Sequence, residues 1–276
     1  MNHSPIGVFD SGVGGLTVLE ALRQVLPNEN YIYLGDTARV PYGNRTSQTI
    51  IKYAASCADQ LVSRGVKAIV IACNTASAHA LEALSAQLDI PVLGVIDPVS
   101  RLAVRTTRTR CIGVIGTRAT VASQAYTRAL HRCDPDVRVY AQACPLFTPI
   151  VEEGWANSEV AALVVHEYLK NLLDSMDPQN AEAIDTLILG CTHYPVLKPR
   201  IASALADMGI RAQLCDCGQA TAADLRQTLA DRGLFNPASR LGSVQYLVTD
   251  DPQQFIAVGR SFMREPPKNV DHIDIV

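Results

Sequence analysis

Two short apolar runs that each end at a cysteine constrain this chain more than any other feature of its sequence. The first run, residues 68–72, stops at Cys73 and is followed by small polar residues and an alanine-rich segment. The second run, residues 186–190, stops at Cys191. Such runs are typical of buried strands in parallel sheets, and small polar residues before an alanine-rich stretch favour a helix start. Each run therefore predicts a strand, a thiol and a helix in that order.

The order strand, helix, strand, helix, thiol strand occurs twice along the chain. It begins at the strand 5–9 with the glycine-rich turn 10–15, and it restarts at residue 111. This rhythm predicts the α/β class, with two pseudosymmetric three-layer lobes, mainly parallel sheets and an active site in the cleft between the lobes. The first lobe is expected to hold residues 1–97 and 211–276, and the second lobe residues 98–210.

The last part of the chain offers too few strands for a third domain. The segments 213–215 and 244–249 are therefore expected to complete the sheet of the first lobe. From residue 265 onward the chain carries two prolines and several charges, and we expect this tail to be poorly ordered.

Charge and hydropathy exclude several classes of protein. The formal net charge of -3 gives no reason to expect a polyanion or a membrane surface as partner. The apolar runs are far shorter than the ~20 residues of a membrane-spanning helix, and the N-terminal residues do not resemble a secretory signal. A basic run at Arg101, Arg105, Arg108 and Arg110 is best explained as a solvated helix face. We expect a cytoplasmic protein that binds neither nucleic acid nor membrane.

The eight cysteines are interpreted as free thiols, because a chain of 276 residues has a core large enough to do without disulfides. Cys215 and Cys217 form a C-x-C pair, but the second pair of ligands that a structural metal site needs does not accompany it. The sequence therefore predicts no metal. A thiol redox enzyme would be expected to carry C-x-x-C, which does not occur in this sequence.

Polar residues gather where the predicted strands end, which is where parallel α/β sheets bind ligands. Two thiols on opposite sides of one carbon could invert its configuration, since one removes the proton and the other returns a proton. Both cysteines precede expected helix starts, a setting that favours the thiolate. None of the five lysines lies in a polar strand-end motif suited to a pyridoxal Schiff base, so we expect no cofactor. Asn74, Thr75 and Thr192 offer hydrogen-bond donors for a carboxylate.

Six motifs together resemble the bacterial glutamate racemase family. They are D-S-G-V-G-G-L-T-V-L from Asp10, G-D-T-A-R-V-P-Y-G from Gly35, A-C-N-T-A-S from Ala72, I-G-T-R-A-T-V from Ile115, C-P-L-F from Cys144 and G-C-T-H-Y-P from Gly190. The resemblance covers nearly the whole chain in order. It implies a cofactor-independent interconversion of L- and D-glutamate, with the D-isomer used in peptidoglycan synthesis.

The resemblance also implies a role for each matching position. Cys73 would deprotonate D-glutamate with help from Asp10, and Cys191 would deprotonate L-glutamate with help from Glu152 and His193. Asp36 would tune the first thiol. The residues implied in holding the amino and α-carboxylate groups are Ser11, Asn74, Thr75 and Thr192, with Asp10 and His193 also lining the substrate site. Those implied in holding the side-chain carboxylate are Pro41, Tyr42, Gly43, Thr117 and Thr120.

Several alternatives stay open at this point. Glu153 competes with Glu152, and only the resemblance favours Glu152. Asp97 and Cys217 stand where family members often carry Glu and Ser, so their roles are undecided. An aspartate racemase, another two-thiol racemase or a one-thiol decarboxylase could use the same scaffold.

Partners beyond the substrate are also undecided at this stage. A homodimer is one option for the assembly, and a non-enzymatic role as a DNA gyrase-binding protein is a separate hypothesis taken from the family. Activation by a cell-wall precursor through an N-terminal extension is not expected.

Overall fold

The computed structural model describes residues 3–176 and 184–275. The chain folds into two compact units, unit 1 with Met1–Val95 and Gly218–Val276, and unit 2 with Ile96–Cys217. The lobes predicted from the sequence, 1–97 with 211–276 and 98–210, stay a prediction. Within them, residues 1, 2, 177–183 and 276 lie outside the described residues.

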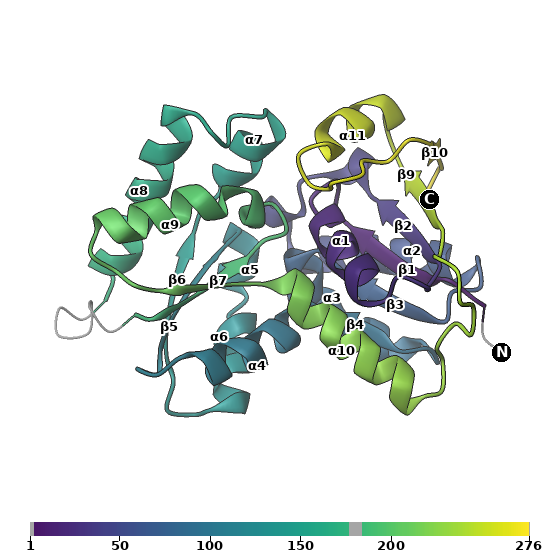
Figure 1. The fold of residues 1–276 in the computed structure, drawn as a ribbon, viewed down its shortest axis with the longest axis horizontal. Helices are drawn as coiled ribbons and strands as arrows, with labels where there is room; N and C mark the ends of the chain where they lie inside the picture. The colour runs from purple at the N-terminus through teal and green to yellow at the C-terminus, as the bar shows by residue number, and fades with distance from the viewer. Residues whose placement is uncertain (1–2, 177–183, 276) are drawn as a thin grey trace. The chain divides into compact units, whose positions relative to one another are not determined.

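Unit 1 is built on a six-stranded parallel sheet with the order β10-β9-β2-β1-β3-β4 (Figure 1). Every residue of the central strand β1 is buried, as expected for a strand covered on both faces. The strands are β1 (Ile6–Asp10), β2 (Tyr31–Gly35), β3 (Ala68–Ile71), β4 (Val92–Gly94), β9 (Val244–Val248) and β10 (Val270–His272).

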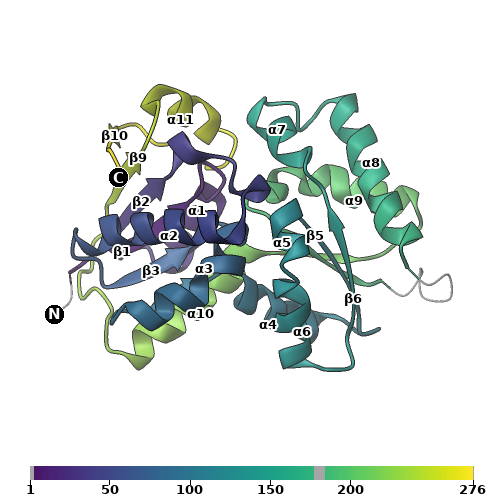
Figure 2. The same ribbon diagram turned by 180° about the vertical axis from the view of Figure 1, so that it is seen from behind.

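Helices cover both faces of this sheet. Helices α1 and α10 lie in front of the sheet in Figure 1, and α2 and α3 lie in front of it in the reverse view of Figure 2. Helix α1 buries Leu16, Leu19 and Leu22, whose spacing places them on one face. The helices are α1 (Leu16–Val25), α2 (Ser47–Val62), α3 (Asn74–Gln87), α10 (Cys217–Asp231) and α11 (Pro252–Gly259), with short 3₁₀ turns η1 (Thr37–Arg39) and η2 (Tyr42–Asn44).

Unit 2 holds a four-stranded parallel sheet with the order β6-β5-β7-β8. Helix α8 packs against β6 and against α9, whereas α4 packs with α6 and against β7 and β8. The strands are β5 (Cys111–Gly116), β6 (Arg138–Ala143), β7 (Thr186–Gly190) and β8 (Gln213–Asp216). The helices are α4 (Ile96–Thr106), α5 (Arg118–Ala122), α6 (Ala125–Cys133), α7 (Phe147–Glu152), α8 (Glu159–Asp174), η4 (Tyr194–Leu197) and α9 (Lys198–Asp207).

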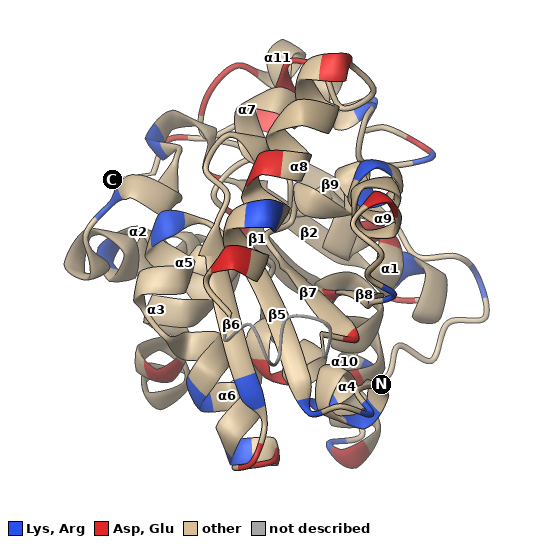
Figure 3. Ribbon diagram, turned by 90° about the vertical axis from the view of Figure 1, so that its left-hand side faces the viewer, with Lys and Arg blue, Asp and Glu red and all other residues tan. Residues whose placement is uncertain are grey.

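Charged residues of unit 2 lie on its helices, its loops and the two edge strands of its sheet, β6 and β8. In Figure 3 the central strands β5 and β7 carry no Lys, Arg, Asp or Glu, while α8 and α9 show both signs interspersed. Mixed charges of this kind do not form the single-sign surface that a polyanion would require. Among the described residues, none of the helices is both long enough and apolar enough to cross a membrane.

The two parallel sheets confirm the predicted α/β class, but two local expectations were wrong. Strand β8 pairs with β7, so it completes the second sheet and not the first. The tail after residue 265 is ordered as far as residue 275, and it forms β10 beside β9. Gln124, whose backbone is left-handed with φ 55°, separates helix α5 from helix α6.

Candidate active site

The first thiol lies where β3 meets helix α3. Strand register pairs Phe9 with Ile71, so the carboxyl ends of β1 and β3 lie side by side. Cys73 is the N-cap residue of α3, and its sulfur accepts a hydrogen bond from the backbone N–H of Ala76 at 3.4 Å. The same sulfur lies 3.6 Å from Ser11 Oγ, to which it donates. The cysteine thus takes the position that Ser, Thr or Asp usually occupies at a helix start.

Asp10 and the glycine-rich turn form the neighbouring wall of this site. The carboxylate of Asp10 is buried and accepts from the backbone N–H of Gly12 at 3.0 Å. Tyr33 is fully buried below the turn and donates its hydroxyl to Gly12 O at 2.9 Å. Burial raises the pKa of Tyr33 well above its usual value, and the negative charges of Asp10 and Cys73 raise it further. The hydroxyl of Tyr33 therefore keeps its proton and donates it to the glycine-rich turn.

A glycine is required at one position of this turn. A Cβ on Gly15 would lie 2.5 Å from the Cβ of Asp10 and 2.9 Å from the hydroxyl of Tyr33, closer than real contacts allow. The turn therefore lets helix α1 begin directly against the polar end of the sheet.

The remaining residues expected in unit 1 divide into two places. Asn74 and Thr75 are buried in the first turn of α3, beside Cys73. Tyr42 lies in the loop after β2 with a buried ring, and its hydroxyl donates to the buried carboxylate of Asp36. Pro41 is exposed and Gly43 is partly exposed in this loop. The hydroxyl of Tyr42 is thus committed to Asp36, whereas its backbone belongs to an exposed loop.

The second thiol directly follows β7, at the carboxyl end of the sheet of unit 2. Cys191 is buried, and its sulfur lies 3.8 Å from His193 Nδ1. The other ring nitrogen, Nε2, lies 2.9 Å from Glu152 Oε1 at the end of helix α7. Thr192 is buried between them, with its hydroxyl 3.4 Å from His193 Nδ1. The expected helix after Cys191 begins as the 3₁₀ turn η4, which leads into α9.

The histidine of this cluster is a strong base. Burial alone would lower the pKa of His193, but hydrogen bonds to Cys191 and Glu152, together with the negative charges of both groups, raise it from 6.5 to about 10. The contacts of His193 therefore favour the protonated, imidazolium form of its ring. A positive ring between a sulfur and a carboxylate favours the thiolate form of the sulfur.

Thr148 also contacts this thiol, and nothing in the sequence pointed to it. Its hydroxyl lies 3.9 Å from the sulfur of Cys191. Thr148 and Glu152 are four residues apart on α7, so they share one face of that helix. One face of α7 therefore contacts Cys191 directly through Thr148. The same face reaches Cys191 indirectly through Glu152, which contacts His193.

Two further threonines lie at the end of the neighbouring strand β5. The hydroxyl of Thr117 accepts from the backbone N–H of Thr120 at 3.2 Å, which caps helix α5. Gly116 pairs with Gly190 across the sheet, so Thr117 and Cys191 follow paired residues on adjacent strands. Thr117 and Thr120 therefore lie at the same sheet edge as Cys191, and their hydroxyls lie 3.0 Å apart.

The positions that depart from the family pattern have defined surroundings. Cys217 is buried, donates to the carbonyl of Leu189 at 3.6 Å and lies 3.4 Å from the hydroxyl of Tyr126. Asp97 forms an ion pair with Arg132 at 2.6 Å, near the surface. Among the described residues, no group of three or more His, Cys, Asp or Glu side chains could hold a metal ion.

Comparison with known proteins gives the site its context. Residues 7–225 match the model of the Asp/Glu/hydantoin racemase family. The chain belongs to this family. It is 47% identical over 263 residues to a glutamate racemase of Geobacter metallireducens, covering 95% of this chain and 94% of that protein.

Solved structures of family members resemble this one over almost their full length. A Thermus thermophilus glutamate racemase in complex with β-chloro-D-alanine is 44% identical with a TM-score of 0.86, covering 99% of this chain and 97% of that one. A Francisella tularensis glutamate racemase in complex with D-glutamate is 38% identical with a TM-score of 0.89, covering 99% and 98%. Both structures of the family hold a small chiral amino acid.

Proposed function

We propose that this chain is a glutamate racemase that uses Cys73 and Cys191 as its two bases. The observation that carries the proposal is that each unit presents a buried thiol at the carboxyl end of its parallel sheet, surrounded by polar groups. The full-length similarity to glutamate racemases supports the substrate. D-glutamate made in this way would serve peptidoglycan synthesis, and we place the reaction in the cytoplasm.

The proposed reaction needs one thiolate and one thiol at the start. In the L-to-D direction, the thiolate of Cys191 takes the α-proton, so an S–H bond forms as the Cα–H bond breaks. The electron pair stays on Cα and is delocalised into the α-carboxylate. The thiol of Cys73 then donates its proton to the other side of Cα and becomes a thiolate. The D-to-L direction runs through the same steps in reverse.

The surroundings of each thiol match these steps. His193 as an imidazolium stabilises the thiolate of Cys191, and Glu152 holds the ring in place. On the other side, the N–H of Ala76 and the start of α3 stabilise the thiolate of Cys73. Asp10 is the polar partner of that side, since it ends β1 beside β3 and its carboxylate is held by the glycine-rich turn.

Hydrogen-bond donors for the substrate are available from the residues named above. Asn74, Thr75 and Thr192 would bind the α-carboxylate, and Ser11, Asp10 and His193 would contact the amino end. The side-chain carboxylate would take donors from the 41–43 loop and from Thr117 and Thr120. The hydroxyl of Tyr42 already donates to Asp36. We therefore assign the donors of this loop to the backbone N–H groups of Tyr42 and Gly43.

A direct test measures inversion by circular dichroism with each enantiomer of glutamate and of aspartate. We expect inversion of both enantiomers of glutamate, with solvent deuterium at the α-position of the product in deuterated water. Inversion of aspartate but not of glutamate would assign the chain to the aspartate alternative.

The two thiols are tested by Cys73→Ala and Cys191→Ala, each of which should abolish racemisation. Cys133→Ala is the matched control, because Cys133 is an exposed cysteine at the C-terminal end of helix α6. Full activity in either of the first two variants would refute the two-base scheme. Homodimer formation and gyrase binding stay predictions; unchanged supercoiling by gyrase at high protein excess would remove the latter.

A further inference from the structure

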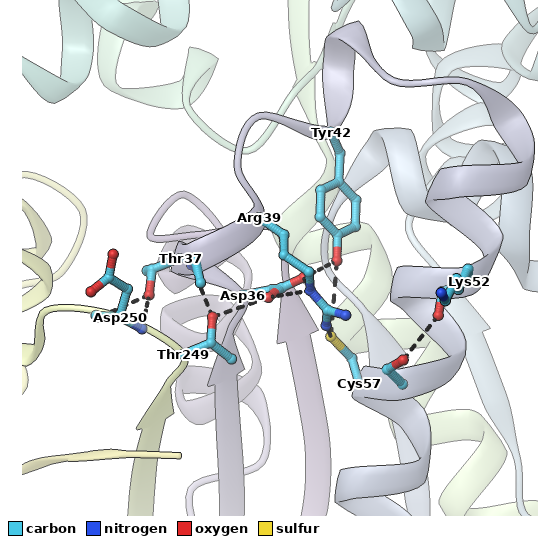
Figure 4. A network of polar contacts seen from close by, with 10 residues as sticks. Asp36, Thr37, Arg39, Tyr42, Lys52, Cys57, Thr249 and Asp250 are labelled. Atoms are coloured by element: carbon cyan, nitrogen blue, oxygen red, sulfur yellow. Dashed lines mark hydrogen bonds and ion pairs between the residues drawn. The ribbon is translucent and has the colours of Figure 1, made fainter. Parts of the chain in front are cut away.

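Asp36 has a different role in the structure from the one that family resemblance implied. It directly follows β2, and its side chain is fully buried. Both carboxylate oxygens accept from Arg39 Nε, at 2.9 and 2.7 Å. Oδ2 also accepts from the hydroxyl of Tyr42, and Oδ1 accepts from Thr249 Oγ1 at 3.0 Å. These bonds lead into the loop that follows β2 and to the end of β9 (Figure 4).

Thr249 connects the same loop to a strand more than two hundred residues away. Its hydroxyl donates to Asp36 and accepts from the backbone N–H of Ala38 at 2.9 Å. The next residue, Asp250, exchanges two hydrogen bonds of 2.8 Å with the hydroxyl of Thr37. The end of β9 thus holds the first half of the loop by both side-chain and backbone bonds.

Side chains of the loop, Tyr42 and Arg39, also anchor it to the buried groups beneath it. The ring of Tyr42 is buried, and burial raises the pKa of its hydroxyl far above the usual value, so the hydroxyl keeps the proton that it donates to Asp36. The guanidinium of Arg39 lies 4.5 Å from the centre of the Tyr53 ring and 3.8 Å from the sulfur of Cys57. Helix α2, which carries Tyr53 and Cys57, therefore supports the loop from the opposite side to β9 (Figure 4).

The charge of Asp36 is compensated inside this network. Arg39 forms an ion pair with Asp36, with 2.7 Å between Arg39 Nε and Asp36 Oδ2. The hydroxyl of Tyr42 donates to Oδ2, and the hydroxyl of Thr249 donates to Oδ1. A carboxylate that is neutralised by an adjacent guanidinium exerts little net field at a distance. Its observed bonds go to residues 39, 42 and 249, which makes the loop and not the thiol of Cys73 its target.

We propose that Asp36 and Thr249 are positioning residues that hold the 37–44 segment in the shape that binds the side-chain carboxylate of glutamate. The proposal rests on the proposed function, because the backbone N–H groups of Tyr42 and Gly43 are the donors that it positions. Loss of the anchor lets these donors move, which weakens substrate binding and leaves the proton transfers at the thiols intact.

The test is the kinetics of Thr249→Val with L- and D-glutamate. Valine keeps the shape of the side chain but removes the bonds to Asp36 and Ala38. We expect KM for both enantiomers to rise by roughly 3–10-fold, as for loss of a buried hydrogen bond, with kcat within about twofold of wild type. Thr249→Ser should restore KM. Thr228→Val is the matched control, since that hydroxyl donates to Asp224 O within helix α10, and it should leave KM unchanged.

Tyr42→Phe gives an independent reading if Thr249→Val folds poorly. It removes the other bond to Asp36, so it should raise KM similarly, and the double variant should raise KM by less than the product of the two single effects. An unchanged KM in an active Thr249→Val enzyme would overturn the proposal that Asp36 and Thr249 position the 37–44 segment. So would a fall in kcat with a shifted pH profile, which would indicate that Asp36 tunes the thiol. Wild-type protein that fails to invert glutamate overturns the proposed function instead.

Discussion

Replacing Glu152 by glutamine tests the charge arrangement around Cys191. Glu152 Oε1 lies 2.9 Å from His193 Nε2, and the ring is buried while the carboxylate side chain is 38% exposed. Hydrogen bonds to charged groups contribute about 1.5–3 kcal/mol, and solvent screening of the exposed carboxylate favours the lower end of that range. Since one pKa unit corresponds to about 1.4 kcal/mol, we expect the pKa of His193 to fall by about one unit. It would move from about 10 to about 9.

Nuclear magnetic resonance titration of the His193 ring measures this shift directly, with His193→Asn used to assign the signal. The alkaline limb of the kcat/KM profile should move down by the same amount, because that limb reports groups of the free enzyme. The kcat/KM values of the two directions must stay equal in every variant, because enantiomers have equal free energies in water. This equality is an internal check on the assay.

Glu153→Gln is the matched control for this prediction. Glu153 is the exposed neighbour at the end of α7, and its backbone N–H bonds to Pro149 O. It should leave the titration of His193 unchanged. An identical titration in Glu152→Gln and wild type, or an equal shift in Glu153→Gln, would show that the contact between Glu152 and His193 does not set the histidine charge.

Three further predictions follow from single contacts. Thr148→Val removes a hydroxyl 3.9 Å from Cys191, so kcat/KM should fall about 3–10-fold in both directions and Cys191 should be alkylated more slowly at pH 7; unchanged rates would exclude a role for Thr148. Gly15→Ala forces a Cβ within 2.5 Å of Asp10, which should lower the unfolding free energy by about 1–3 kcal/mol and reduce activity; a wild-type melting temperature would contradict this. The pKa of His193 is raised above 6.5 in the native state, so its stabilising contribution is complete below pH 6.5 and is lost as the pH rises to about 10. The difference in unfolding free energy between wild type and His193→Asn, measured with urea, should therefore shrink between pH 6.5 and about 10. A difference that stays constant over this range would contradict the raised pKa of His193.

Local sequence pattern was sufficient to predict the central strands that precede the two cysteines. The apolar runs before Cys73 and Cys191 form β3 and β7. These features depend on residues close together in the chain, so periodicity and turn chemistry reveal them. The resemblance alone favoured Glu152 over Glu153, and the structure places Glu152 against His193.

Features that depend on contacts between residues far apart in the chain could not be predicted from local sequence pattern. The four residues of β8 suit either sheet, and only their pairing with β7 decides between them. The charged tail looked disordered because its short strand β10 is stabilised by β9 rather than by its own sequence. Thr148 is 43 residues from Cys191 and Thr249 is 213 residues from Asp36, so no local signal marks either of them.

The strand order of unit 1 has a consequence for the newly made chain on the ribosome. Strand β2 lies between β1 and β9, and β9 belongs to the last forty residues of the sequence. Until β9 has left the ribosome, β2 is an open edge that could pair with another nascent chain. Unit 2 comes from one continuous stretch and can close earlier. A chain released before Thr249 would thus carry both thiols, an unprotected strand edge and a substrate loop without its anchor.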